Sequence, residues 1–540
     1  MVENKDEPDE LPENESQSSI EAAESNPEGS PQAEKEEEAA QANEHPSKGW
    51  WWKRPTVRQI LEQEAKSGIE GWDKSDKKAN EVSRLPDDES IHLGGVVLAE
   101  AFTPSTVSAL YESIGRSPFS QEYKVQEIVD FIERSRSGAQ VGGSYLFGLV
   151  RPPGRLIMMN GFSDPSLPEG VDAVWLTLHC PTPSLTILIA TFSLEEDAGD
   201  LSCLLRKDYK TRFNPEIKIP GRLGKLRAKI PWSRPIQYGI GGTISLVEIQ
   251  KREAYEQVAS QIEEGCREWL SRNFGGRFSR EPMEHRPSAR LLLTKNQAPY
   301  KDHRRYLSPL GMDYPFSWRS QGAACWAIRY NDFILDKKRR FALVAAARRS
   351  DIAKSAIGYV DRPKSIWHAT QGFHKYEFQM VSRWAMFALI ALYEDRLGRL
   401  RDQAGQQQWR TVGIARELDR FLLGDGLDAS AIASDLGNFS RDPQGFPHDF
   451  SEYVADQDPF PGEPTEEAEE PAKLVDFWRE RLEKQCTRLL EDMETTTGNI
   501  RASAELKQSI ANTKMQRLVI GLAFIAAIVA VVSLYVTASS

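Results

Sequence analysis

Residues 518 to 536 decide how the chain is organised, and they read LVIGLAFIAAIVAVVSLYV. The stretch carries no charged side chain, and twelve of its nineteen residues are Leu, Ile, Val or Phe. As an α-helix it would be about 28 Å long, close to the thickness of the hydrocarbon core of a bilayer. Large apolar residues favour insertion by about 0.3 to 0.6 kcal/mol each. We therefore predict a transmembrane helix at 518–536 rather than a buried core helix, since only Thr537 to Ser540 follow it.

The charges beside this span predict its orientation. Four cations precede the span and no basic residue follows it; the four are Arg501, Lys507, Lys514 and Arg517. Because cytoplasmic flanks of spans carry an excess of Lys and Arg, we expect the body ahead of the span to be cytoplasmic. The N-terminus lacks the charged-then-apolar pattern of a signal peptide. The expected topology is that of a tail-anchored, single-pass membrane protein, with the lipid bilayer as a partner.

Residues 473–517, just ahead of the span, predict a stalk helix. Apolar side chains recur there at steps of three or four, at Leu474, Trp478, Leu482, Cys486, Leu489 and Met493. Residues 495–499 weaken the pattern, because a glycine such as Gly498 costs about 1 kcal/mol relative to Ala inside a helix. The helix is expected to restart at Ile500 and continue into the span. We expect Leu474, Trp478, Leu482 and Leu489 to hold a coiled-coil-like bundle, within one chain or between the chains of a homo-oligomer.

The N-terminal residues 1–49 differ in composition from the rest. They carry a net charge of −12, while the whole chain carries −11, so the remaining residues sum to +1. The segment is poor in large apolar side chains and cannot bury enough surface to fold, so we predict a disordered acidic tail. A nearly neutral remainder argues against a nucleic-acid-binding protein, which usually has a basic excess. Five scattered cysteines without a CxxC pair exclude a disulfide framework and a four-cysteine zinc site.

Residues 50–90 are interpreted as a connecting segment. It opens with Trp50-Trp51-Trp52-Lys53-Arg54. We favour the interpretation that these tryptophans pack on the folded body. The alternative is a membrane interface, where Trp next to cations is enriched.

Residues 91–360 predict an α+β domain in which a mixed sheet is combined with helices. Apolar strands are expected at 145–150 and 155–159, joined as a hairpin, at 173–180 and 185–194, at 289–294 and at 326–335. Asp200 would cap a short helix. A longer helix is expected at about 245–274, with Val258, Ile262, Cys266 and Leu270 on its buried face. Cys266 is therefore predicted to be a core residue rather than a nucleophile.

Residues 361–455 predict a helical subdomain. The apolar run Trp384–Tyr393 is too short to cross a bilayer and has charged residues on both sides, so we expect a buried central helix. Two further helices are expected at 408–423 and 429–439, separated by Gly424-Asp425-Gly426. Residues 456–472 are acidic and rich in Pro, and are interpreted as a linker.

The sequence contains none of the usual motifs of catalysis or cofactor binding. It has no G-x-x-x-x-G-K-[ST], no G-x-G-x-x-G and no nucleophile elbow, and its eight histidines are scattered. We predict no catalytic residue and no metal ligand, and the sequence identifies no cofactor. A non-enzymatic role is favoured, although the sequence leaves open an enzyme with an unrecognised site.

One stretch could bind anions. Residues 218–234 read KIPGRLGKLRAKIPWSR, with six cations and no acid. Such a strip could hold the phosphates of a nucleotide, lipid headgroups or an acidic peptide, and the alternative is a solvated loop. The candidate anion-binding residues are Lys218, Arg222, Lys225, Arg227, Lys229 and Arg234. We hypothesise that the acidic tail competes at this strip with an anionic ligand or with the membrane surface.

Several stretches resemble uncharacterised bacterial single-span membrane proteins. They are Pro183–Phe192, Leu205–Tyr209, Trp269–Phe274 and Pro287–Thr294. The C-terminal third, from helix through stalk to span, is distantly similar to CorA-type magnesium transporters. That resemblance implies an α/β cytosolic domain, long stalk helices and a homo-pentamer. We expect the membrane to be a bacterial inner membrane. The family's Gly-Met-Asn signature follows the first of two spans, whereas here the nearest triplet is Gly311-Met312-Asp313, far from the single span, so no pore residue is carried over.

The leading functional prediction is a tail-anchored, non-enzymatic sensor or scaffold that self-associates through its stalk. The alternative is a CorA-like membrane effector or ion-pathway protein assembled from single spans. Ser533 and Tyr535 are the only polar side chains inside the span, whereas an ion pathway usually contains a charged or strongly polar residue at that depth.

Overall fold

The computed structural model describes residues 73–116, 122–140, 142–155, 161–217, 240–282, 285–299, 305–310, 312, 317–320, 327–330, 342–355, 366–406, 420–442, 453–455 and 473–539. The predicted acidic tail, the Trp50–Trp52 segment, the cationic strip 218–234 and the linker 456–472 lie outside these residues. The chain divides into two compact units, Met1–Glu70 and Gly71–Ser540. The described residues all belong to the second unit, which combines a mixed sheet with helices and so has the α+β class that the sequence predicts.

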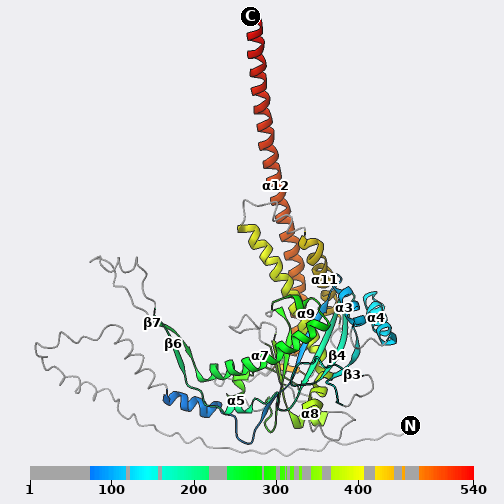
Figure 1. The fold of residues 1–540 in the computed structure, drawn as a ribbon, viewed down its shortest axis with the longest axis vertical. Coiled ribbons are helices and arrows are strands. Elements are labelled where there is room, and N and C mark those ends of the chain that lie inside the picture. The colour runs from blue at the N-terminus through cyan, green and yellow to red at the C-terminus, as the bar shows by residue number, and fades with distance from the viewer. Residues whose placement is uncertain are drawn as a thin grey trace, which may run out of the picture. The chain divides into compact units, whose positions relative to one another are not determined.

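The centre of this unit is a ten-stranded mixed sheet with the order β12-β9-β10-β11-β8-β1-β5-β4-β2-β3 (Figure 1). Its strands are β1 (Ile91–Phe102), β2 (Gly143–Arg151), β3 (Gly161–Ser163), β4 (Val171–Thr182), β5 (Leu185–Leu194), β8 (Ser288–Thr294), β9 (Ser317–Ser320), β10 (Ala327–Tyr330), β11 (Ala342–Arg348) and β12 (Tyr453–Ala455). The pairs β8–β11 and β2–β3 are parallel, and the others are antiparallel. A separate two-stranded ribbon consists of β6 (Arg212–Ile217) and β7 (Ile240–Ser245).

Helices cover both faces of the central sheet. One face packs against α8 (Arg349–Ser355), α9 (Ile366–Gln406), α11 (Leu427–Arg441) and α12 (Leu474–Ser539), and the other against α3 (Val107–Arg116), α4 (Glu122–Arg136), α5 (Ser202–Arg206) and α7 (Val247–Asn273). Successive residues of β1 and β5 alternate between these two cores, as the two-residue period of a strand requires. Because both faces are covered, these strands are continuous apolar runs, which is why the sequence revealed β4 and β5 so clearly.

The helix α9 contains the apolar run Trp384–Tyr393, and all ten of its side chains are buried, as predicted. It packs against β1, β5 and α12. The Gly424–Gly426 stretch that the sequence places between two helices is instead the end of a π-helical segment, η6 (Leu422–Gly426), which continues directly into α11. The helix predicted at 408–423 falls mostly outside the described residues.

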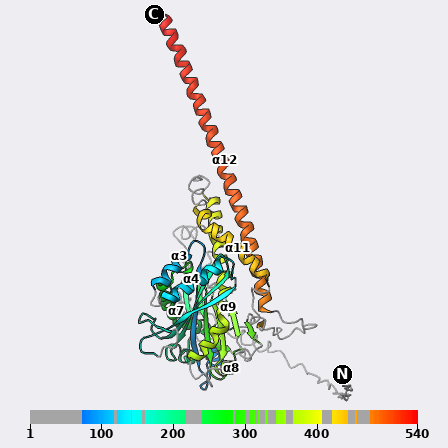
Figure 2. The ribbon, with the colours of Figure 1, turned by 90° about the vertical axis from the view of Figure 1, so that its right-hand side faces the viewer.

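The helix α12 is unbroken over 66 residues. The predicted interruption at 495–499 is wrong, because one glycine costs about 1 kcal/mol while helix formed on both sides favours propagation through it. Figures 1 and 2 show the first half of α12 beside α11. Beyond the bundle, Ala511–Ala538 is long and apolar enough to cross a membrane, and none of that window is buried within the described structure.

The stripe Leu474, Trp478, Leu482 and Leu489 is at most 1% exposed and lies in one core with α9 and α11. The Trp478 ring stacks on Trp384 at 6.0 Å between centroids. The stripe thus forms a bundle within one chain. Self-association stays a prediction, and it would have to use other residues than these four.

One local prediction needs correction. On α7, Cys266 and Leu270 are buried as predicted, but Val258 is 36% exposed. A strict step of four advances the face by about 40° per step, so the buried face passes instead through Tyr255 and Ala259. Of the hairpin predicted from 145–150 and 155–159, the first strand lies within β2, which pairs with β4 and β3, and the second lies almost wholly outside the described residues.

Candidate functional site

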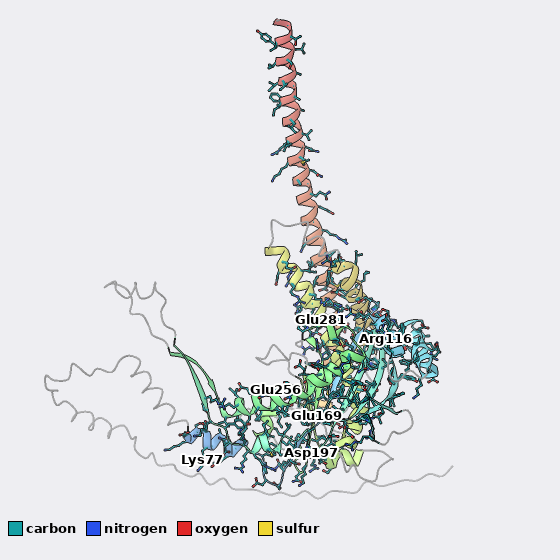
Figure 3. All side chains as sticks on the ribbon, in the orientation of Figure 1. Lys77, Arg116, Glu169, Asp197, Glu256 and Glu281 are labelled. Atoms are coloured by element: carbon teal, nitrogen blue, oxygen red, sulfur yellow. The ribbon has the colours of Figure 1, made fainter. Side chains whose placement is uncertain are left out.

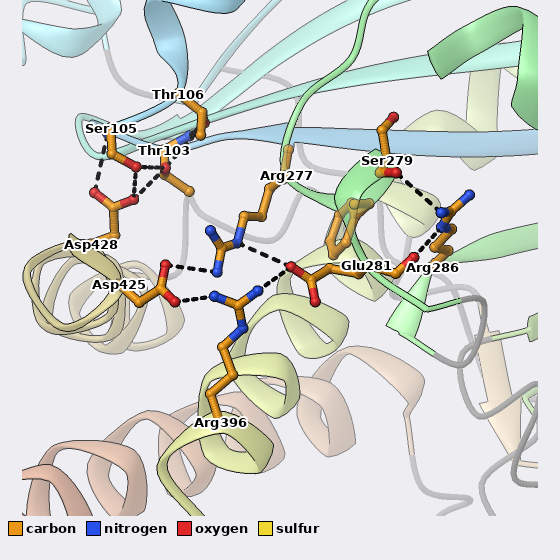
Figure 4. A network of polar contacts seen from close by, with 12 residues as sticks. Thr103, Ser105, Thr106, Arg277, Ser279, Glu281, Arg286, Arg396, Asp425 and Asp428 are labelled. Atoms are coloured by element: carbon orange, nitrogen blue, oxygen red, sulfur yellow. Dashed lines mark hydrogen bonds and ion pairs between the residues drawn. The ribbon is translucent and has the colours of Figure 1, made fainter. Parts of the chain in front are cut away.

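The six cations predicted to bind anions, Lys218, Arg222, Lys225, Arg227, Lys229 and Arg234, fall outside the described residues. Among the residues that the structure does describe, no group of three His, Cys, Asp or Glu side chains is placed to hold a metal ion. One set of charged side chains that the fold brings together lies along the connection between α7 and β8, among the described residues 275–282 and 285–286 (Figure 4).

This connection passes very close to the end of β1. The Arg277 amide donates a hydrogen bond to the Ala101 carbonyl at 2.8 Å. A Cβ on Gly276 would lie 2.7 Å from the same carbonyl oxygen and 2.7 Å from Glu100 Cγ. Only glycine fits such a close approach of two backbones. Gly276 therefore determines the position of the 3₁₀ turn that follows, η2 (Phe278–Arg280).

A buried carboxylate holds that turn. Glu100 accepts hydrogen bonds from the amides of Phe278 at 2.5 Å and Ser279 at 2.9 Å, and from the Ser279 hydroxyl. Its side chain is fully buried in the sheet, and burial raises its pKa to about 7, although these donors act in the opposite direction. Glu100 thus joins the central strand to the connection through a group that titrates near neutrality.

Four charges form a closed ring beside the turn. Arg277 pairs with Asp425 at 2.8 Å and lies 3.8 Å from Glu281. Arg396 of α9 pairs with both Glu281 and Asp425 (Figure 4). The charges alternate in sign around the ring, and the side chains of Arg277 and Glu281 are 8% and 4% exposed. We call these four residues the ionic ring; it joins the 275–286 connection to α9 and to η6.

A second contact reinforces the attachment of α11. Asp428, in the first turn of α11, accepts hydrogen bonds from the Ser105 hydroxyl at 2.5 Å and amide at 3.2 Å, and from the Thr103 hydroxyl. The acids Asp425 and Asp428 therefore attach the start of α11 to two different loops at the same end of the sheet. Segments of π-helix are frequent at functional sites, and η6 supplies one of these acids.

A cavity of about 500 Å³ opens on the other side of the connection. The C-terminal half of α7 supplies one wall, and Ser279 and Arg286 supply the other; the lining consists of Glu264, Arg267, Glu268, Ser271, Arg272, Ser279 and Arg286. The Ser271 hydroxyl donates to the Ser279 hydroxyl at 2.9 Å. Arg286 donates to the carbonyls of Glu281 at 2.7 Å and Ser279 at 3.1 Å. The cavity and the ionic ring therefore share one short stretch of chain.

Another buried charge cluster lies between α7 and β8 and has a structural role. Arg290 pairs with Glu256 and Glu263 at 3.0 Å each, and Arg267 pairs with Glu263. Glu256 is labelled in Figure 3. Burial would raise the pKa of Glu263, but Arg267 and Arg290 hold it at about 2. The cluster contains two cations and two anions, so its charges neutralise one another.

Comparison of the chain with protein-family models, curated proteins and solved structures found no match. The resemblance to CorA-type transporters thus stays a prediction; Gly311 and Asp313 lie outside the described residues.

Proposed function

We propose that this protein is a single-pass membrane protein whose α+β body acts beside the bilayer as a non-enzymatic sensor or scaffold. The observation that carries the proposal is α12, one helix that begins in the core of the body and ends in an apolar, unburied segment. Leaving so many large apolar side chains in water would be costly, and a bilayer removes that cost.

The side of the membrane is inferred from charge. Arg501, Lys507, Lys514 and Arg517 all precede the apolar segment. The excess of cations on that flank favours a cytoplasmic body.

The sensor role draws on the site. The cavity residues Ser279 and Arg286 lie on either side of Glu281 in the sequence, and Glu281 belongs to the ionic ring. The ring contacts α9 and η6, and α9 and α11 pack against α12. A ligand in the cavity would therefore act on a stretch of chain that is joined to the membrane helix through two elements. Self-association through α12 remains part of the proposal, and it requires surfaces other than the buried stripe.

Extraction from membranes tests the anchor. We expect the full chain to stay in the membrane pellet at alkaline pH, and a chain lacking Leu518–Ser540 to appear in the soluble fraction with the same thermal unfolding midpoint. A truncated chain that still pellets with washed membranes would refute anchoring by α12.

Cysteine labelling tests the orientation. Cys203 is exposed, whereas Cys180, Cys266 and Cys486 are buried. In a Cys325→Ser background, a membrane-impermeant maleimide should label Cys203 only after spheroplasts are permeabilised, and should label Ser540→Cys in intact ones. Labelling of Cys203 in intact spheroplasts would reverse the assigned orientation.

A further inference from the structure

We propose that the cavity lined by α7, Ser279 and Arg286 binds the phosphate group of a small molecule. Its volume of about 500 Å³ lies within the range of about 300 to 1,000 Å³ that is typical of ligand sites. The proposal identifies what the sensor of the preceding section would detect, and so rests on that proposed function. Binding can be measured separately from anchoring, so either can fail alone.

The surroundings of Arg286 are the first observation that supports phosphate binding. Its guanidinium is half-buried and donates to two backbone carbonyls, and no carboxylate of the described residues forms an ion pair with it. Burial and the neighbouring Arg267 lower the pKa of Arg286, and the carboxylates of Glu100, Glu264 and Glu281 offset this only in part. An anion in the cavity would relieve both effects, because Arg donates to phosphate through two parallel N–H groups.

Further donors surround the same space. Arg272, in the last turn of α7, lines the cavity and is exposed, and the described residues provide no ion pair to it. The Ser271 hydroxyl donates to Ser279, whose own hydroxyl donates to Glu100, so these two hydroxyls order the cavity wall. Guanidinium donors from both walls, Arg272 on α7 and Arg286 beyond η2, suit a tetrahedral oxyanion, which accepts hydrogen bonds in several directions.

The acids of the cavity limit the size of the ligand. Glu264 and Glu268 are exposed on α7 and line the same cavity. A long polyanion would have to pass these two acids and would be repelled by them. A single phosphate placed between Arg272 and Arg286 would be repelled less. The site therefore suits a small phosphorylated molecule rather than a nucleic acid.

The position of Arg286 connects binding to the ionic ring. Its Nε atom holds the carbonyl of Glu281, whose carboxylate pairs with Arg396. A phosphate that draws Arg286 towards the cavity competes with that carbonyl bond. Occupancy of the cavity therefore acts on a residue that contacts α9.

Titration with inorganic phosphate tests the proposal. The full chain in neutral detergent should bind phosphate saturably in calorimetry at constant ionic strength. Arg286→Gln and Arg272→Gln should each weaken binding about 10- to 100-fold, as expected for a lost charged hydrogen bond. Arg280→Gln is the matched control, because Arg280 is exposed on η2 and does not line the cavity, and its affinity should stay within about twofold of the parent.

The outcomes are decisive even if one variant is unstable. Arg272 is exposed, so Arg272→Gln reports on binding should Arg286→Gln fail to fold. No saturable binding, or equal affinity of Arg272→Gln and Arg280→Gln, overturns the proposal.

A second arm separates the two sources of a phosphate group. The same titration is repeated in nanodiscs of phosphatidylcholine alone and with phosphatidic acid. Equal phosphate affinity in both discs indicates a soluble ligand. Loss of phosphate binding in the anionic discs, which added sodium chloride does not restore, indicates that a lipid headgroup occupies the site.

Discussion

Single residues at the end of β1 determine how the sheet is joined to the helical layer. Glu100 is a buried carboxylate that uses both of its oxygens on η2, and Gly276 allows the chain to pass beside it. The residues that meet at this junction are far apart in the sequence, since η2 follows Glu100 by 178 residues. The chemistry of this junction therefore rests on a few side chains.

Glu100 should make stability depend on pH. Its pKa is about 7 in the folded protein and 4.5 is its ordinary value, so between these values only the folded state holds the proton. The stabilising contribution is complete below about pH 4.5 and is lost as the pH rises to about 7, by about 3 kcal/mol in total. We expect Glu100→Gln to lose less stability than the parent between pH 5 and 8, measured by urea unfolding in detergent. Parallel profiles for the two proteins would contradict the raised pKa.

Arg277 should be the most sensitive member of the ionic ring. Replacing it with Ala leaves Glu281, which is 4% exposed, and Asp425 each with Arg396 as the remaining ring partner. We expect a loss of about 3 to 5 kcal/mol, as for a broken buried ion pair. Arg280→Ala, three residues away and exposed, should change stability by less than about 0.5 kcal/mol. Equal losses of stability for the two variants would show that the ionic ring contributes nothing to the free energy of unfolding.

At the scale of elements, the long helix α12 combines a buried and an exposed part. Its first turns bury Leu482 and Trp478, whereas Gly498 and the residues of the apolar segment are exposed. The two parts should therefore respond differently to substitution.

Gly498→Ala should stabilise α12 locally. A Cβ at this position meets nothing within 4 Å, so only the helix propensity changes, by about 1 kcal/mol. Amide exchange around residue 498 should slow by about fivefold. Gly95→Ala is the contrasting variant, because its Cβ would lie 2.5 Å from the Phe192 carbonyl oxygen, and it should destabilise the sheet. Faster exchange in Gly498→Ala would argue against an unbroken helix.

Leu482→Ala should cost about 2 to 5 kcal/mol, since the residue is 0% exposed in the core shared with α9 and α11. The same change at Leu423, which is 78% exposed on η6, should be nearly neutral. Thermal unfolding of both variants checks the pair, and similar shifts would place Leu482 outside the core. A charged residue at Leu482 would disrupt this core, so it cannot by itself report on association between chains.

Sequence patterns predicted the elements that contain long apolar runs. They failed for elements whose structure is determined by a few residues. Leu185–Leu194 and Trp384–Tyr393 were recognisable because each buries every residue. The π-helical form of Leu422–Gly426 was not, because the two glycines suggest a turn and packing against the body overrides that preference. The stripe on α7 was misplaced because a pattern of fours drifts around a helix.

At the scale of the whole molecule, the candidate site could not be predicted from the sequence. Arg277, Arg396 and Asp425 come from three separate segments, and no spacing links them. A cation strip such as 218–234 is visible because its charges are consecutive. The cavity arginines are dispersed over 20 residues among acids, so composition hides them. The local signal was the pair Gly275-Gly276, which indicates a close approach of backbones.

The unbroken course of α12 has a mechanical consequence. Its 66 residues correspond to a rod of about 100 Å, without a hinge that would absorb a pull. Tension applied at the apolar end would travel along the axis to the turns around Trp478, where it would act as shear on the rows of side chains packed against α9 and α11. Traction on this protein would therefore load the helical bundle before the sheet.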